Sequence, residues 1–202
     1  MVDLALLQSI SYMAGALGVC IAAIFYVLNL RISQRNLREA ERNKKIQLSI
    51  SIADKLGSKE FRRDYLTLWQ LDWKDTEDFM KKYDSSVKTE DAGEHWAQRW
   101  SMWLTYDNLG FLLREGLVDD DVVYNSSAND SIMIWGKYWP MIDYYRRRQL
   151  GQRLLENFEF LAKTMWEMGK IRGRISPGFK SDSSWYEFKD VFEPEDAAST
   201  SP

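Results

Sequence analysis

Arginine is the residue type in this chain whose spacing most directly suggests chemistry. Arg146, Arg147 and Arg148 are consecutive, and Arg153 follows within two helical turns. Guanidinium groups bind phosphate oxygens well, so these four residues predict an anion site for a nucleotide or an anionic lipid headgroup. Consecutive residues point in different directions around a helix, however, so all three cannot face one ligand. A solvated face near a helix end is the alternative interpretation.

Few other residues suggest catalysis or metal binding. The chain has one histidine, His95, and one cysteine, Cys20. Histidine-pair metal sites, thiolate clusters and disulfides within the chain are therefore excluded. Asp119, Asp120 and Asp121 are better explained as the acidic first turn of a helix than as metal ligands. No phosphate-binding loop, dinucleotide fingerprint, nucleophile elbow or zinc motif is present. We predict no catalytic residue, no metal and no cofactor, and we do not expect an enzyme.

Tryptophan is unusually frequent, with nine residues. Most of them form pairs or triplets four or three residues apart, as Trp96, Trp100 and Trp103 do. Residues at this spacing are neighbours on a helix, so they form aromatic strips. Such strips either fill a bundle core or line a binding surface. We expect most tryptophans in the core and some at an interface, and we expect Trp185, Tyr186 and Phe188 to form a short docking segment.

The element that indicates a membrane location is the uncharged stretch from Leu4 to Leu30. A bilayer core of about 30 Å requires about 20 apolar residues, so this stretch can span it. A cleavable signal peptide is the alternative, but its apolar core would be shorter and its start basic. Basic residues follow the stretch at once, and these predicted headgroup contacts are Arg31, Arg35, Arg38 and Arg42. The excess of positive charge predicts a cell (inner) membrane protein with its N-terminus outside and its C-terminal domain cytoplasmic.

One face of this anchor differs from the others. Small and polar residues recur on it at alternating spacings of three and four: Gln8, Ser11, Gly15, Gly18, Ala22, Phe25 and Asn29. This period keeps a seam turned toward a partner helix, and small residues allow close packing in lipid. The partner is either a second copy of the chain or another integral membrane protein. Because this seam breaks at Asn36, Glu39 and Asn43, we predict no coiled coil beyond the anchor.

The rest of the chain has helical periodicity nearly throughout and no alternating pattern that supports a sheet. The fold class is therefore all-α: one transmembrane helix that continues into a cytoplasmic helical bundle, followed by a partly disordered tail. We expect Gly57 and Ser58 to end one helix and begin the next, and Asn125 to Asp130 to interrupt the bundle. The predicted divisions are the anchor (1–30), a juxtamembrane helix (31–57), the bundle (58–170) and an irregular docking segment with an acidic tail (171–202).

Several segments are similar to those of a known family. They are Tyr106-Asp107-Asn108-Leu109-Gly110-Phe111-Leu112-Leu113-Arg114-Glu115-Gly116-Leu117-Val118-Asp119, then Trp135-Gly136, Trp139-Pro140-Met141-Ile142, Tyr145-Arg146 and Phe158-Glu159-Phe160-Leu161. From 97 to 162 the chain resembles small prokaryotic proteins catalogued only as a domain of unknown function. The resemblance implies one N-terminal anchor followed by a helical domain. Its motifs are structural and imply no catalytic residue.

Together these patterns predict a non-catalytic interaction protein. It would be an accessory or scaffold subunit of a membrane complex, or a homo-oligomer. The alternative is a membrane-tethered sensor that binds a nucleotide or an anionic lipid through Arg146–Arg148. With a net charge of −3, nucleic acid is not an expected partner, whereas membrane lipid is.

Overall fold

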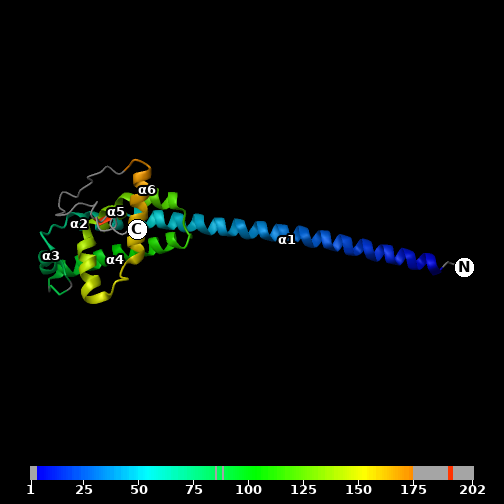
Figure 1. The fold of residues 1–202 in the computed structure, drawn as a ribbon, viewed down its shortest axis with the longest axis horizontal. Coiled ribbons are helices and arrows are strands. Elements are labelled where there is room, and N and C mark those ends of the chain that lie inside the picture. Colours follow the sequence, from blue (N-terminus) through cyan, green and yellow to red (C-terminus); the bar gives the residue numbers. More distant parts are fainter. Residues whose placement is uncertain (1–3, 85, 88, 175–190, 193–202) are drawn as a thin grey trace, which may run out of the picture. The chain divides into compact units, whose positions relative to one another are not determined.

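A computed structural model describes residues 4–84, 86–87, 89–174 and 191–192. Throughout these residues the fold is all-α, as predicted, and contains no strand. The helices are α1 (Leu4–Gly57), α2 (Lys59–Gln70), α3 (Thr76–Tyr83), α4 (Glu90–Arg114), α5 (Asp120–Tyr145), a π-helical turn (Arg146–Leu150) and α6 (Glu156–Ile171) (Figure 1). The chain forms two units, Met1–Gln47 and Leu48–Pro202. The predicted disordered tail lies outside the described residues.

The first unit is the long N-terminal part of α1. Every side chain from Gln8 to Gln47 is exposed, so no described residue covers this segment. The helix continues without a break past the end of the apolar stretch, as the sequence predicts. An isolated helix gains little stability in water, and most helical stability in proteins comes from packing of one face.

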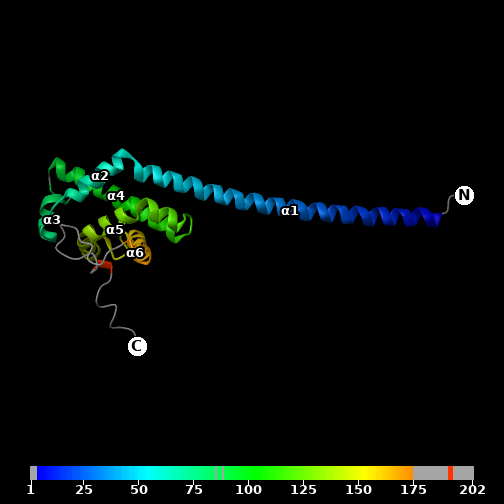
Figure 2. The ribbon, with the colours of Figure 1, turned by 90° about the horizontal axis from the view of Figure 1, so that it is seen from above.

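The second unit is a helical bundle in which α6 packs against both α4 and α5. α4 and α5 run in opposite directions, and α6 lies across both of them (Figures 1 and 2). Leu56 at the end of α1 is buried in the same core, with Leu48 and Ile52 packed against it. The end of α1 therefore belongs to the bundle, while its exposed part does not.

Local sequence signals set most helix boundaries in the bundle. The Ser58 hydroxyl accepts a hydrogen bond from the Phe61 amide at 3.2 Å, which confirms the predicted stop and restart at this point. The Thr89 hydroxyl caps α4 through the Ala92 amide in the same way. At the other end of α4, Gly116 adopts a φ of 64°, and the Leu117 amide donates to the Leu112 carbonyl at 2.9 Å. This Schellman geometry requires a left-handed residue, which glycine supplies without strain.

The predicted interruption from Asn125 to Asp130 is wrong. α5 runs unbroken through these residues and also through Pro140. Ser126 and Ser127 do not compete with the helix, because their hydroxyls donate to carbonyls one turn back, at 2.8 and 2.9 Å. Val123, Ala128 and Ile132 are buried on the inner face, and this burial holds the helix where its polar composition suggests a break.

Aromatic side chains fill the core. Trp103 and Trp135 are fully buried, and Trp73 and Trp166 are nearly so. Three further tryptophans pack partly buried against this core: Trp69, Trp100 and Trp139. Of the tryptophans that the structure describes, Trp96 is the exposed one, at 37%. The structure thus assigns most of the tryptophan strips to packing, where each ring buries about 150–250 Å².

α4 and α6 meet at their backbones, at Gly110. A Cβ placed on Gly110 would lie 1.9 Å from the carbonyl oxygen of Asn157. One turn earlier on α4, the Asp107 carboxylate accepts hydrogen bonds from the Asn157 and Phe158 amides at 3.0 and 2.9 Å. The start of α6 has no cap of its own, because Leu155 precedes it in a left-handed conformation with φ of 55°. Asp107 therefore caps α6 from another helix, and Gly110 makes the approach possible.

Candidate functional site

The seam predicted on the anchor is fully exposed in the chain. Within the described residues, α1 is the one helix long and apolar enough to cross a membrane, and no part of its apolar window is buried. A Cβ placed on Gly15 or on Gly18 would meet no atom within 4 Å, so both glycines face open space. Gln8 donates from Nε2 to the Tyr12 hydroxyl at 3.4 Å. All seven seam residues, Gln8, Ser11, Gly15, Gly18, Ala22, Phe25 and Asn29, are thus available to a partner helix.

The four predicted headgroup residues follow the apolar stretch on the same helix. Arg31, Arg35, Arg38 and Arg42 are all exposed. Arg35 forms an ion pair with Glu39 at 3.0 Å, one turn along the helix. An exposed pair of this kind contributes little to stability, so these side chains can reorient toward a charged surface.

The predicted anion cluster is divided by the structure. Arg146 points inward and is only 10% exposed. Its guanidinium donates to the Leu154 carbonyl at 2.8 Å and to the Glu159 carboxylate at 2.7 Å. It also lies over the Trp135 and Trp139 rings, 5.6 and 5.4 Å from their centroids. Arg146 therefore joins the π-helical turn to α6, and its charge is already compensated.

The other three arginines are exposed, and two of them share a groove. Arg153 forms a two-point ion pair with Glu156. Arg147 pairs with Asp143 at 3.0 Å, and Arg148 lies over the Tyr144 ring at 4.9 Å. Arg147 and Arg148 both line a groove of about 720 Å³, whose other lining residues are Thr76, Glu77, Met80, Trp139, Pro140, Asp143 and Tyr144. Arg148 and the aromatic rings could contact an anionic ligand, while Glu77 and Asp143 also line the groove and Arg147 is paired with Asp143.

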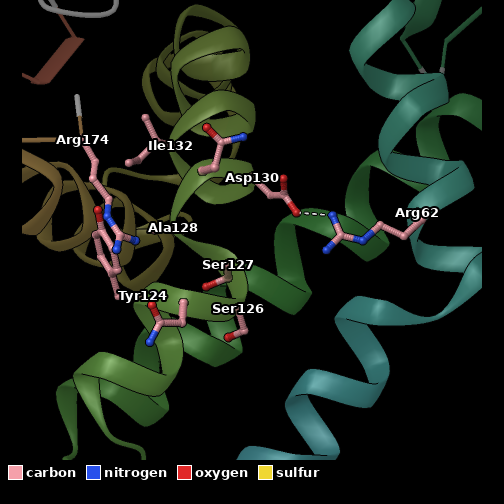
Figure 3. Close-up of a pocket in the computed structure, with 10 residues that line it drawn as sticks. Arg62, Tyr124, Ser126, Ser127, Ala128, Asp130, Ile132 and Arg174 are labelled. Carbon is pink, nitrogen blue, oxygen red and sulfur yellow. Dashed lines mark hydrogen bonds and ion pairs between the residues drawn. The ribbon is translucent and has the colours of Figure 1, made fainter. Parts of the chain in front are cut away.

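A second hollow, of about 390 Å³, lies along α5 (Figure 3). On one side Arg62 of α2 pairs with Asp130, and on the other Arg174 lies against the Tyr124 ring at 5.7 Å. Ser126 and Ser127, between them, use their hydroxyls to bond their own helix. The Arg62, Asp130 and serine side chains of this hollow are therefore engaged within the chain, and we assign the hollow no ligand.

Two buried cations could not be recognised from the sequence. Lys137 is 3% exposed and donates to main-chain oxygens at the end of α2, at 2.7 Å to Leu71, between the rings of Trp69 and Trp73. Burial lowers the pKa of Lys137 to about 8, and Asp72 opposes this shift only partly. Arg99 is fully buried, donates to the Tyr83 carbonyl, and has its pKa lowered by burial.

The surroundings of Lys137 and Arg99 indicate a structural role, because both side chains donate to main-chain carbonyls. The carbonyls that end a helix carry partial negative charge, and a lysine aimed at them caps the helix from outside. Lysine and arginine side chains are normally exposed, so no sequence pattern distinguishes these two from surface residues. Among the described residues, no group of three or more histidine, cysteine, aspartate or glutamate side chains is placed to hold a metal ion.

The predicted docking segment, Trp185, Tyr186 and Phe188, lies outside the described residues. The nearby Val191 and Phe192 are described, and both are buried. The Phe192 ring stacks on the Trp166 ring of α6, with 4.6 Å between centroids and 8° between planes. Part of the C-terminal region is therefore held against the chain's own bundle, a contact that the sequence patterns do not predict.

The fold and these sites define an all-α protein with a tryptophan-rich bundle and one helix long and apolar enough to cross a membrane, as far as the chain is described. The chain belongs to the family described as Domain of unknown function (DUF4760), whose family model matches residues 13–166. The predicted resemblance to an uncharacterised family is confirmed, and the match extends from the anchor into α6. No curated protein and no solved structure matches the chain.

Proposed function

We propose that this protein is a non-catalytic, single-pass membrane protein that acts by binding other proteins. It would be an accessory or scaffold subunit of a membrane complex, or a homo-oligomer. α1 would cross the cell (inner) membrane with its N-terminus outside, and the bundle would lie in the cytoplasm. The basic residues after the apolar stretch support this orientation, because cytoplasmic flanks carry the excess of positive charge.

One observation carries the proposal: α1 is exposed along its apolar stretch and beyond it, and the small residues of the anchor lie on one of its faces. Side chains from Gln8 to Gln47 are all exposed within the chain. Lipid can cover an apolar segment, but it provides no reason for small residues to be gathered on one face. A packed partner helix does, because small residues let two backbones approach. The helix thus has a lipid-facing side and a side suited to another helix.

The polar groups of the bundle support a non-catalytic role. Lys137, Arg99 and Arg146 are the buried or nearly buried cations described above, and each donates to main-chain or carboxylate oxygens. Perturbed groups at active sites usually lie in a cleft beside an open position for substrate. Here they hold helix ends and neighbouring segments together.

The test is the mass of the full-length protein purified from membranes in mild detergent, read by native mass spectrometry. The test variant carries Gly15→Leu and Gly18→Leu on the seam. Its matched control carries Ala16→Leu and Ala23→Leu, which add similar bulk to another face of the same helix. Because a side chain at either glycine would contact nothing within the chain, the added bulk acts on whatever lies outside it.

We expect a defined oligomer or hetero-complex that the glycine variant weakens and the alanine variant leaves intact. A monomer for the unaltered protein would contradict the proposal. Equal effects of the two variants would show that bulk anywhere on the helix matters, and would remove the seam as the contact surface.

A second candidate function rests on the groove that Arg147 and Arg148 share with Trp139 and Tyr144. It would bind a nucleotide or an anionic lipid headgroup and make the protein a membrane-tethered sensor. The test is binding of ATP, and of anionic versus neutral vesicles, to the full chain and to an Arg147→Ala/Arg148→Ala variant. Arg153→Ala is the control, because Arg153 is exposed and does not line the groove. If Arg153→Ala reduced binding as much as Arg147→Ala/Arg148→Ala, the groove would not be the binding site and this second function would be refuted.

A further inference from the structure

The part of α1 that follows the apolar stretch is charged and exposed, and no described residue packs against it. Residues 31–47 are helical and entirely exposed, and they span about 25 Å at 1.5 Å per residue. Ile32, Leu37 and Ile46 are 57%, 62% and 47% exposed. Most helical stability in proteins comes from packing of one face, so packing against another element would stabilise this segment.

Although the anchor's pattern of small residues breaks at Asn36, Glu39 and Asn43, α1 itself is unbroken, so its seven-residue frame can be followed through these positions. Gly15, Ala22 and Asn29 are seven residues apart, and the same step reaches Asn36 and Asn43. A second row at the same step consists of Ser11, Gly18, Phe25, Ile32, Glu39 and Ile46. These two rows are the a and d positions of one continuous heptad frame. A straight helix departs from this frame by about 20° per heptad, which a left-handed supercoil with a second helix corrects.

The three asparagines identify the partner. Asn29, Asn36 and Asn43 all occupy a positions and are all exposed within the chain. A carboxamide both donates and accepts, so two identical amides facing each other can satisfy one another. An asparagine at an a position selects paired helices in parallel and in register, at some cost in stability. Three in succession at one spacing fit a copy of the same helix better than an unrelated apolar surface.

The charges beside the seam select the parallel arrangement. Arg35 and Arg42 occupy g positions, while the e positions are uncharged Ser33, Ala40 and Gln47. Parallel helices place g opposite e, so each arginine meets a neutral residue. Antiparallel helices would place g opposite g and bring the arginines together. Glu39 at a d position is the one seam residue that would face a like charge, and its ion pair with Arg35 at 3.0 Å offsets that charge within each chain.

We propose that the partner is a second copy of this chain, with two α1 helices paired in parallel and in register from Ser11 to Ile46. Asn29, Asn36 and Asn43 each lie opposite their counterparts. The inference rests on the proposed function and specifies its partner. The small residues of the anchor pack within the bilayer, and the asparagines fix the register where the helices leave it.

Disulfide trapping in isolated native membranes, with copper–phenanthroline added as the oxidant, tests the pairing with the full chain. Cys20 falls at an f position, away from the seam, and is replaced by serine to give a cysteine-free background. Asn36→Cys and Asn43→Cys then place a thiol on the seam. The matched controls, Gln34→Cys and Glu41→Cys, place it at f positions on the opposite face. All four positions are exposed, so none of the changes disturbs the bundle.

Identical cysteines can be joined only where their Cβ atoms approach about 3.8 Å, so we expect at least about tenfold more disulfide dimer from the seam variants than from the controls. Co-expression of two differently tagged copies identifies the dimer as two copies of this chain. Absence of dimer from Asn36→Cys and Asn43→Cys, or equal yields at both pairs of positions, would overturn the proposal.

The outcome is separable from that of the proposed function. A native complex that holds one copy of this chain and another protein, without seam disulfides, would refute the homodimer and leave the interaction role standing. A monomer by native mass and by trapping would refute both.

Discussion

Replacing Gly110 by alanine tests the joint between α4 and α6 most directly. The added Cβ would lie 1.9 Å from the Asn157 carbonyl oxygen, 2.6 Å from its carbonyl carbon and 3.2 Å from the Leu161 Cβ. Ordinary contact distances are about 3.5 Å, so α6 would have to withdraw by about 1.5 Å. The closest obstacles are main-chain atoms, which cannot move away as a side-chain end could.

The energetic cost has two parts. Overpacking in a well-packed core costs typically about 1–3 kcal/mol. Withdrawal of α6 also lengthens the hydrogen bonds of 2.9–3.0 Å from its first amides to Asp107, and loss of such a cap costs about 1 kcal/mol. We therefore expect Gly110→Ala to lower the free energy of unfolding of the bundle by about 3 kcal/mol.

Gly93→Ala is the matched control, because Gly93 lies in the same helix and nothing would contact its new methyl group. It should raise the free energy of unfolding by about 0.5–1 kcal/mol, since alanine favours the helix more than glycine does. The assay is denaturant unfolding of the full chain in mild detergent, followed by tryptophan fluorescence. All nine tryptophans lie after α1, so the signal reports on the bundle. A Gly110→Ala variant as stable as the Gly93→Ala variant would refute the packing described.

Three further predictions use the same assay. The stability of the bundle should rise by about 2 kcal/mol from pH 8 to pH 10, because over this range the unfolded chain holds a proton that buried Lys137, with a pKa near 8, has released. The rise in stability should end near pH 10, because tyrosines ionise at lower pH in the unfolded chain than in the folded bundle. Lys137→Met should remove the rise. A denaturation midpoint of the unaltered protein that stays constant from pH 8 to pH 10 would contradict the lowered pKa of Lys137. Arg146→Ala should cost about 2 kcal/mol because it removes the hydrogen bonds of a nearly buried side chain to the Leu154 carbonyl and to Glu159, which keeps its ion pair with Lys163. Arg147→Ala and Arg148→Ala should each stay within about 0.5 kcal/mol, and equal costs at the three positions would show that Arg146 is not the inward residue. Phe192→Ala should cost about 3 kcal/mol because its buried ring stacks on Trp166, and an unchanged midpoint would show that the contact with α6 does not persist in solution.

Features that depend on nearby residues can be predicted from the sequence. The change of helix at Gly57 and Ser58 is predictable because a serine cap acts on an amide three residues away. The apolar stretch of α1 is recognisable from composition alone. The aromatic strips predict a core from their spacing, and the structure places seven of the eight described tryptophans in that core or against it.

Tertiary packing decided what those local patterns could not. Asn125 to Asp130 has the composition of a loop, but burial of the opposite face keeps it helical. Arg146, Arg147 and Arg148 are equivalent as a sequence, yet only Arg146 turns inward, because Glu159 and two aromatic rings from other segments surround it. Lys137 caps a helix to which it does not belong, and Asp107 does the same for α6.

The sequence by itself thus determined the all-α class, the change of helix at Gly57 and Ser58, and that one helix suits a membrane, because these properties arise from residues within a few turns of each other. Only the tertiary structure decided which charged side chains are buried, which helices touch at Gly110, and which part of α1 packs into the bundle. Those properties depend on contacts between residues far apart in the chain, whose partners no local pattern specifies.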